Sequence, residues 1–214
     1  MKIRNIPQYI QISWNDFLRQ KIIMPPKIRK LKNKDFTVIA SNCNGGVLCS
    51  DLGVGFNSPT VNVWFYPDDY LRMVSNLREY MAYELIEVSD DTVPYPVGEL
   101  KGNVRIYFQH YHSFEEAKAA WNRRKARMNY DNVFLMFTDR NGCTEEQLKR
   151  FDRLPYKNKI VFTCKPHPEL KSCIWCQEYE NQDEVPILTL YRNWRGERLY
   201  DRYFDFVRWF NGEA

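Results

Sequence analysis

The sequence predicts an α/β fold, with three α/β/α layers around a mostly parallel, Rossmann-like sheet. In the middle third of the chain, strand-like apolar runs alternate with helix-like amphipathic runs, as in crossover units that connect parallel strands. The run 132–138 is almost continuously apolar, which is typical of a strand buried on both faces of a parallel sheet. Capping patterns at Ser113 and Thr144 mark the starts of two helices.

The elements follow in order along the chain. A capping pattern at Ser13 predicts a helix that ends at Pro25 and Pro26, and a basic connector then leads to the first strand. β-branched, aromatic and aliphatic runs predict strands over 36–41, 60–66, 85–88, 103–112, 132–138, 159–163 and 186–191. Apolar spacing predicts helices over 67–81, 113–128, 144–154 and 198–210. We expect 89–102, with its two prolines, to be a loop.

The length and composition indicate one domain over residues 1–214. The chain has 214 residues, of which 44% are hydrophobic and 27% charged, a globular composition with enough apolar residues for a substantial core. Within that domain we expect an N-terminal helix and basic connector over 1–34, the core sheet with its crossover helices over 35–191, and an aromatic C-terminal helix over 192–214.

Charge and segment patterns exclude several classes of function. The net charge of +4 is too mild for a protein that binds duplex nucleic acid. No transmembrane segment or signal peptide is apparent, so we expect a cytoplasmic protein, with attachment to the inner face of the membrane left open. We expect the six cysteines to be free thiols.

The ends of the predicted strands carry the candidate site, because ligands of open α/β sheets bind beyond the carboxyl ends of the strands. The predicted substrate-binding residues are Asn42, Asn44, Gly45, Gly46, Arg140 and Arg124. The predicted catalytic residues are His110, His112 and Asp139. If 103–112 is one strand, His110 and His112 point the same way and suit a general base or an anion site.

Each motif also has a structural interpretation. The Asn-Gly-Gly stretch could be a turn only, the histidines could be hydrogen-bonded structural groups, and Asp139 could cap a turn. Arg124 could belong to a solvated helix face. Cys164, His167, Cys173 and Cys176 have the residue types of a zinc site, but five residues between the two pairs is a short separation, so we predict no metal site.

Several of these stretches together resemble a known family. "SNCNGG", "SPTVNVWF", "HYHSFEEAKAAWNRRKARMN" and "DNVFLMFTDRNG" are similar to the bacterial exopolysaccharide (capsule) biosynthesis proteins, a family defined by a single domain of unknown function. The resemblance covers the chain from about Asp35 to Tyr191. It implies a three-layer α/β fold and a setting in polysaccharide synthesis, and it assigns no catalytic residues.

These observations favour a transferase that acts on an activated sugar or a lipid-linked glycan. On this hypothesis a nucleotide sugar or sugar phosphate is the ligand, a histidine is the base, and Asp139 with Arg140 orients the substrate or a divalent cation. One alternative is an acyltransferase or hydrolase with Cys43 as nucleophile. The other is a non-catalytic protein that contacts polysaccharide assembly proteins through the segment 24–34 and the C-terminal helix.

Overall fold

The computed structural model describes the backbone of residues 6–213 and the side chains of residues 9–213. It confirms a mixed α/β fold. The chain divides into two compact units. Unit 1 comprises Met1–Lys34, Val47–Gly55 and Pro186–Ala214, and unit 2 comprises Asp35–Gly46 and Phe56–Val185. One domain over residues 1–214 stays a prediction.

Unit 2 contains a parallel sheet with the strand order β1-β5-β6-β7. Its strands are β1 (Thr37–Ala40), β5 (Val133–Thr138), β6 (Asn158–Thr163) and β7 (Cys173–Trp175). Every residue of β1 and β5 is buried, as their apolar runs predict. The strand β7 was not anticipated, because its three residues are too few to show a periodic pattern.

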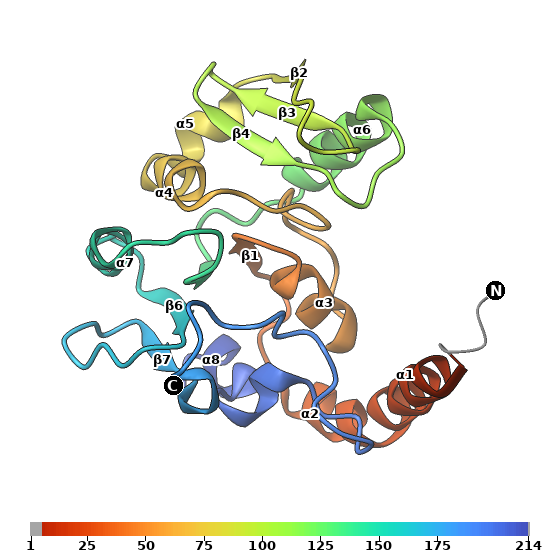
Figure 1. The fold of residues 1–214 in the computed structure, drawn as a ribbon. Coiled ribbons are helices and arrows are strands. Elements are labelled where there is room, and N and C mark those ends of the chain that lie inside the picture. The colour runs from red at the N-terminus through yellow and green to blue at the C-terminus, as the bar shows by residue number, and fades with distance from the viewer. Residues whose placement is uncertain (1–5, 214) are drawn as a thin grey trace. The chain divides into compact units, whose positions relative to one another are not determined.

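Unit 2 also contains a small antiparallel sheet, β2-β3-β4 (Figure 1). Its strands are β2 (Leu85–Val88), β3 (Val97–Leu100) and β4 (Val104–Tyr107). The expectation that 103–112 belongs to the parallel sheet is therefore wrong, and so is the loop expected over 97–100. Lys101 and Gly102, with φ of 57° and 71°, form the tight turn that returns the chain antiparallel from β3 to β4.

Unit 2 contains four helices, and the single helix predicted over 67–81 is divided into two at Asn76. They are α4 (Pro67–Ser75), α5 (Leu77–Ala82), α6 (Phe114–Lys125) and α7 (Glu145–Asp152). The two capping predictions are confirmed: Ser113 Oγ accepts from Glu116 N, and Thr144 forms a capping box with Gln147. The core of unit 2 stacks Tyr70 of α4 on Phe137 of β5, with 5.1 Å between the ring centroids.

Unit 1 is helical. The helices α1 (Ile6–Leu18) and α2 (Met24–Lys30) are joined by a π-helical turn, η2 (Arg19–Ile23), so Ser13 does not begin a helix. Pro25 and Pro26 do not end one either, because they occupy the first turn of α2, where a missing N–H is tolerated. The C-terminal helix is interrupted: a 3-10 turn, η4 (Leu199–Arg202), precedes α8 (Phe206–Phe210).

Two further predicted strands are absent. The segment 60–66 forms one isolated bridge, Trp64 to Tyr107, and 186–191 forms one at Tyr191. Segment 60–66 is held instead by scattered contacts: Thr60 Oγ1 accepts from the amide of Ala40, and Phe65 N donates to Ser41 O. Its β-branched residues indicate burial here rather than strand pairing.

The division between the units falls within α3 (Asn44–Asp51). The 3-10 turn η3 (Gln177–Tyr179) belongs to unit 2.

Candidate functional site

Asn42 and Asp139 lie beyond the carboxyl ends of neighbouring parallel strands, β1 and β5. Asn42 Nδ2 donates to Thr138 Oγ1 at 3.0 Å, which joins the two strand ends. Asn42 Oδ1 accepts from the amide of Asn44 at 3.1 Å. The helix α3 begins at Asn44, so the expected loop is a short turn in which the Asn42 side chain bonds the first amide of the helix.

Gly45 and Gly46 allow the first turn of α3 to pack closely within unit 2. A Cβ atom on Gly45 would lie 2.8 Å from Ala40 Cβ, and one on Gly46 would lie 3.1 Å from Val61 Cγ1. Close packing therefore explains why both residues are glycines. Their amide groups belong to the first turn of α3, where backbone N–H groups have no intrahelical acceptor. The turn thus combines a packing role with donors that could bind an anion.

Gln109 links His110, but not His112, to the turn after β1. Gln109 Nε2 lies 3.5 Å from Cys43 Sγ and 3.1 Å from His110 Nε2. His112 lies two residues before α6, and its amide donates to Glu116 Oε2. β4 ends at Tyr107, so the expectation that both histidines lie on one strand and point the same way is wrong. Both are exposed.

Asp139 is buried, and backbone groups occupy both of its oxygens. Oδ2 accepts from the amide of Cys164 at 2.6 Å, and Oδ1 accepts from that of Val185 at 2.8 Å. Burial raises the pKa of this carboxyl above its usual value, although both amides act to lower the pKa. Asp139 therefore holds together the segments that follow β5, β6 and η3. These contacts fit the structural interpretation of this residue.

Both predicted arginines also have partners within unit 2. Arg140 Nη1 donates to Val185 O at 2.6 Å, and its Nη2 pairs with Glu184 at 3.1 Å. Arg124 Nη1 donates to Val61 O at 3.2 Å and to the Tyr111 hydroxyl. A ligand at either guanidinium would share a cation that is already hydrogen-bonded.

We call the group Asn42, Cys43, Asn44, Thr138, Gln109 and His110 the strand-end rim.

Sequence reasoning did not select two members of the strand-end rim, Thr138 and Gln109. Thr138 ends an apolar strand, and its polarity at that position is a signal that could have been used. Gln109 precedes a histidine, and its contact with Cys43 joins residues 66 positions apart. A single sequence carries no local signal for that long-range contact.

The cysteines of unit 2 are thiols in environments that oppose ionisation. Burial raises the pKa of the Cys43 thiol, whereas the hydrogen bond from Gln109 acts to lower it. Cys164, Cys173 and Cys176 are also free thiols. Among the described residues, no group of three or more His, Cys, Asp or Glu side chains is arranged to hold a metal ion.

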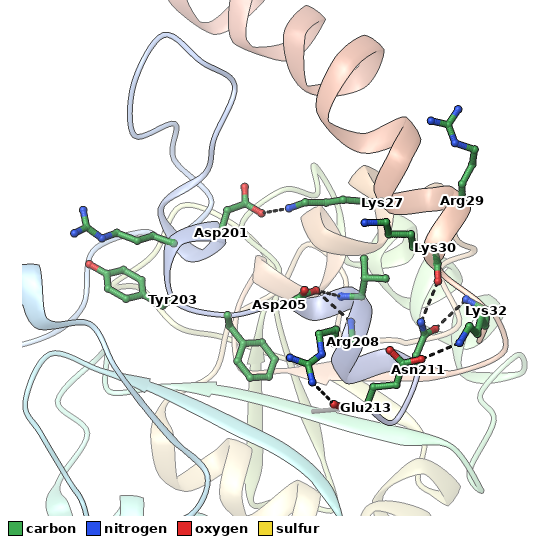
Figure 2. Close-up of a pocket in the computed structure, with 13 residues that line it drawn as sticks. Lys27, Arg29, Lys30, Lys32, Asp201, Tyr203, Asp205, Arg208, Asn211 and Glu213 are labelled. Carbon is green, nitrogen blue, oxygen red and sulfur yellow. Dashed lines mark hydrogen bonds and ion pairs between the residues drawn. The ribbon is translucent and has the colours of Figure 1, made fainter.

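Unit 1 contains a cavity of about 770 Å³ with a basic lining (Figure 2). Its basic side chains are Lys27, Arg29, Lys30, Lys32, Arg202 and Arg208. Three acidic side chains also line it, and each is already bonded. Asp201 pairs with Lys27, Asp205 caps α8, and Glu213 pairs with Lys32.

The lysine-rich half of this cavity, in the segment 24–34, was anticipated as a basic surface. The half contributed by residues 201–213 was not, because the two halves are distant in sequence. Arg29 and Lys30 have no ion-pair partner among the described residues. These two cations are therefore available to an anionic ligand or surface.

Comparison with known proteins assigns the chain to a family. The model of a domain of unknown function, DUF1919, matches residues 14–211. The chain belongs to the DUF1919 family. An uncharacterized protein of Haemophilus influenzae is 44% identical over 183 residues, which are 86% of this chain and 87% of that protein. The single domain of unknown function in the resemblance is thus confirmed, while the exopolysaccharide setting stays a prediction.

Proposed function

We propose that this DUF1919 protein acts in exopolysaccharide biosynthesis as a transferase on an activated sugar or lipid-linked glycan, at the inner face of the membrane. The strand-end rim is the proposed donor site. One observation supports this choice: a helix begins two residues beyond Asn42, at the carboxyl end of a buried parallel strand, and the exposed His110 is linked to the same turn through Gln109. Amide donors and a titratable imidazole are the groups that phosphate binding and proton transfer require.

In this proposal the amides of Gly45 and Gly46 donate to a phosphate of a nucleotide sugar or sugar phosphate. His110 lies against the bound donor and removes the proton from the acceptor hydroxyl, and the sugar passes from the phosphate leaving group to that oxygen. Asp139 is a positioning residue, because backbone amides occupy both of its oxygens. The raised pKa of Cys43 speaks against the acyltransferase or hydrolase alternative, which requires a thiolate.

Ligand binding to paired variants tests the proposal. Calorimetry with a panel of nucleotide sugars should show binding to the parent and to His112→Ala, and binding weakened about fivefold or more in His110→Ala. Both histidines are exposed, so both variants should fold as the parent does. Equal binding by the two variants, or none by the parent, would refute the donor site. If Arg29→Gln/Lys30→Gln loses binding and His110→Ala does not, the ligand site is the cavity of unit 1.

A specific observation favours the non-catalytic alternative as the second candidate function. Unit 1 exposes large apolar side chains on α1, including Ile10 and Phe17, which are 57% and 52% exposed. Exposed apolar surface of this kind is typical of a docking face. A protein that assembles others would need such a face whether or not the strand-end rim turns over a substrate.

A further inference from the structure

The helix α1 is oriented with its polar side inward. Asn15, at 0% exposure, lies on its buried side, and Arg19, at 1% exposure, continues that side at the start of the π-helical turn η2. Asn15 Oδ1 accepts from the amide of Gly196 at 2.9 Å, and its Nδ2 donates to Asn193 O at 2.7 Å. A helix of a protein surrounded by water normally buries its apolar side instead. In α1 the side that is exposed to water is the one that a helix normally buries.

That outward side is apolar and aromatic. Tyr9, Ile10, Trp14 and Phe17 are between 47% and 62% exposed and line one shallow surface. Ile10 and Trp14 are four residues apart, and Tyr9 and Phe17 are eight apart, so all four lie on one face of the helix. Exposed single residues are common, but a contiguous row of four large apolar residues is not.

The loop that holds α1 extends the apolar surface. Trp14 Nε1 donates to Trp194 O at 3.1 Å, and Trp194 is itself 52% exposed. We define the α1 face as Tyr9, Ile10, Trp14, Phe17 and Trp194. It combines two tryptophans and a tyrosine with aliphatic and phenyl groups, the residue types that favour the boundary between lipid and water.

Unit 1 is also strongly basic. It contains fourteen Lys and Arg residues against six Asp and Glu residues, a net charge of +8, whereas unit 2 has seventeen against twenty-one, a net charge of −4. Lys21 follows Phe17 by four residues, one turn along from the α1 face. Farther along the same run of helix, Arg29 and Lys30 line the basic cavity (Figure 2) without ion-pair partners among the described residues.

We propose that unit 1 binds the surface of a lipid bilayer that contains anionic headgroups, with the α1 face in the interfacial layer. The 13 residues of α1 are too few to cross a bilayer, and no helix among the described residues is long and apolar enough to do so. A helix that is apolar on one side and set in a basic region lies in the plane of such a surface. The charge selects this occupant over a second copy of the chain, because two α1 faces in contact would bring together two units of +8.

This inference does not depend on the transferase proposal, because it concerns residues of unit 1 alone. Vesicle flotation tests it, with vesicles of phosphatidylcholine and phosphatidylglycerol in about equal parts and vesicles of phosphatidylcholine alone. The parent should float with the anionic vesicles, much less with the neutral ones, and should be released in about 1 M salt. Ile10→Ser/Phe17→Ser should weaken binding about tenfold or more, since two apolar side chains no longer enter the interface.

Matched variants separate the apolar from the ionic contribution. Ile86→Ser removes a similarly exposed isoleucine (47%) from β2 of unit 2 and should bind as the parent does. Arg29→Gln and Lys30→Gln should each weaken binding about fivefold and reduce its salt dependence. Failure of the parent to float, or equal flotation by Ile10→Ser/Phe17→Ser, would overturn the proposal. A parent dimer in light scattering that becomes a monomer in that double variant would assign the α1 face to a second copy instead.

Discussion

Arg19 and Asp51 form a buried ion pair in unit 1, with 2.6 Å between Arg19 Nε and Asp51 Oδ2. Arg19 begins the π-helical turn, and Asp51 ends α3. Asp51 also accepts from Arg198 and from the Tyr200 hydroxyl, and Arg19 pairs with Asp201 at 2.6 Å. Burial alone would lower the pKa of Arg19, but the charges around it, of Tyr200, Asp201 and Asp51, raise it above its usual value. The network thus keeps the Arg19 side chain fully charged although it is buried in unit 1.

The first prediction is that Asp51→Asn destabilises the protein by about 3 to 5 kcal/mol. The variant preserves the shape of the side chain but leaves Arg19 and Arg198 without their shared carboxylate in a buried place. Urea unfolding followed by tryptophan fluorescence measures the change in free energy of unfolding.

Asp131→Asn is the matched control for that measurement. Asp131 pairs with Arg78 at 3.2 Å, but its side chain is 95% exposed, so its loss should change the free energy of unfolding by about 1 kcal/mol or less. Similar losses in the two variants would show that the Arg19–Asp51 pair contributes no more than a surface pair does.

The second prediction concerns the stability of the protein at acid pH. Burial acts to raise the pKa of Asp201, but hydrogen bonding and charge from Arg19, with the charge of Lys27, hold it below its ordinary value of 3.8. A lowered folded pKa means that this carboxylate contributes stability above the unfolded pKa, and that the contribution is lost as pH falls through the folded pKa. The free-energy difference between the parent and Asp201→Asn should therefore shrink steadily below a pH of about 4. A difference that stays constant from neutral to acid pH would contradict this assignment.

The sequence predicted best what neighbouring residues decide. The caps at Ser113 and Thr144 are confirmed, because each side chain bonds an amide only three residues ahead. The strand predicted over 132–138 from its apolar run is found at 133–138. Such contacts can be read from a single short window.

Long-range partners decided the rest. Segment 60–66 has strand-like composition, yet it forms scattered contacts with Ser41 and Ala40. The inward placement of Asn15 depends on partners about 180 residues away. Of the candidate site, the sequence correctly placed Asn42 and Asp139 beyond the ends of two neighbouring parallel strands, but it was wrong about the strand that precedes His110. It also could not show that Asp139 bonds the amide of Val185 or that Arg140 pairs with Glu184.

The third prediction is that Cys43 reacts slowly with alkylating agents at neutral pH. Burial raises the pKa of its thiol, and the thiolate is the reactive form. Labelling with iodoacetamide, followed by peptide mass spectrometry, compares the modification of Cys43 in the folded and the urea-unfolded protein. Modification in the folded protein should be lower by roughly tenfold for each unit by which folding raises the pKa of the thiol. Cys143, whose pKa burial raises to about 12, is the internal reference. Rapid labelling of Cys43, with loss of ligand binding, would favour the alternative in which Cys43 is a nucleophile.

The last prediction separates the packing role of Gly45 from its role as an amide donor. Alanine favours helices by about 1 kcal/mol over glycine, so Gly45→Ala would stabilise the protein if space allowed. Its Cβ would instead lie 2.8 Å from Ala40 Cβ and 3.0 Å from Val38 Cγ1, and a Cβ atom cannot move without its backbone. We therefore expect Gly45→Ala to lower the free energy of unfolding by about 1 to 3 kcal/mol.

A rescue variant and a control complete this measurement in urea. Ala40→Gly removes the Cβ atom that the new Cβ would meet. The free energy of unfolding lost in Gly45→Ala/Ala40→Gly should therefore be smaller than the sum of the losses in the two single variants. Ser50→Ala, at an exposed position of the same helix, should change stability by about 0.5 kcal/mol or less. If Gly45→Ala is as stable as the parent, α3 can shift away from β1, and packing no longer explains the glycine. Its remaining explanation would then be access of a ligand to the backbone, which ligand binding to the same variant would test directly.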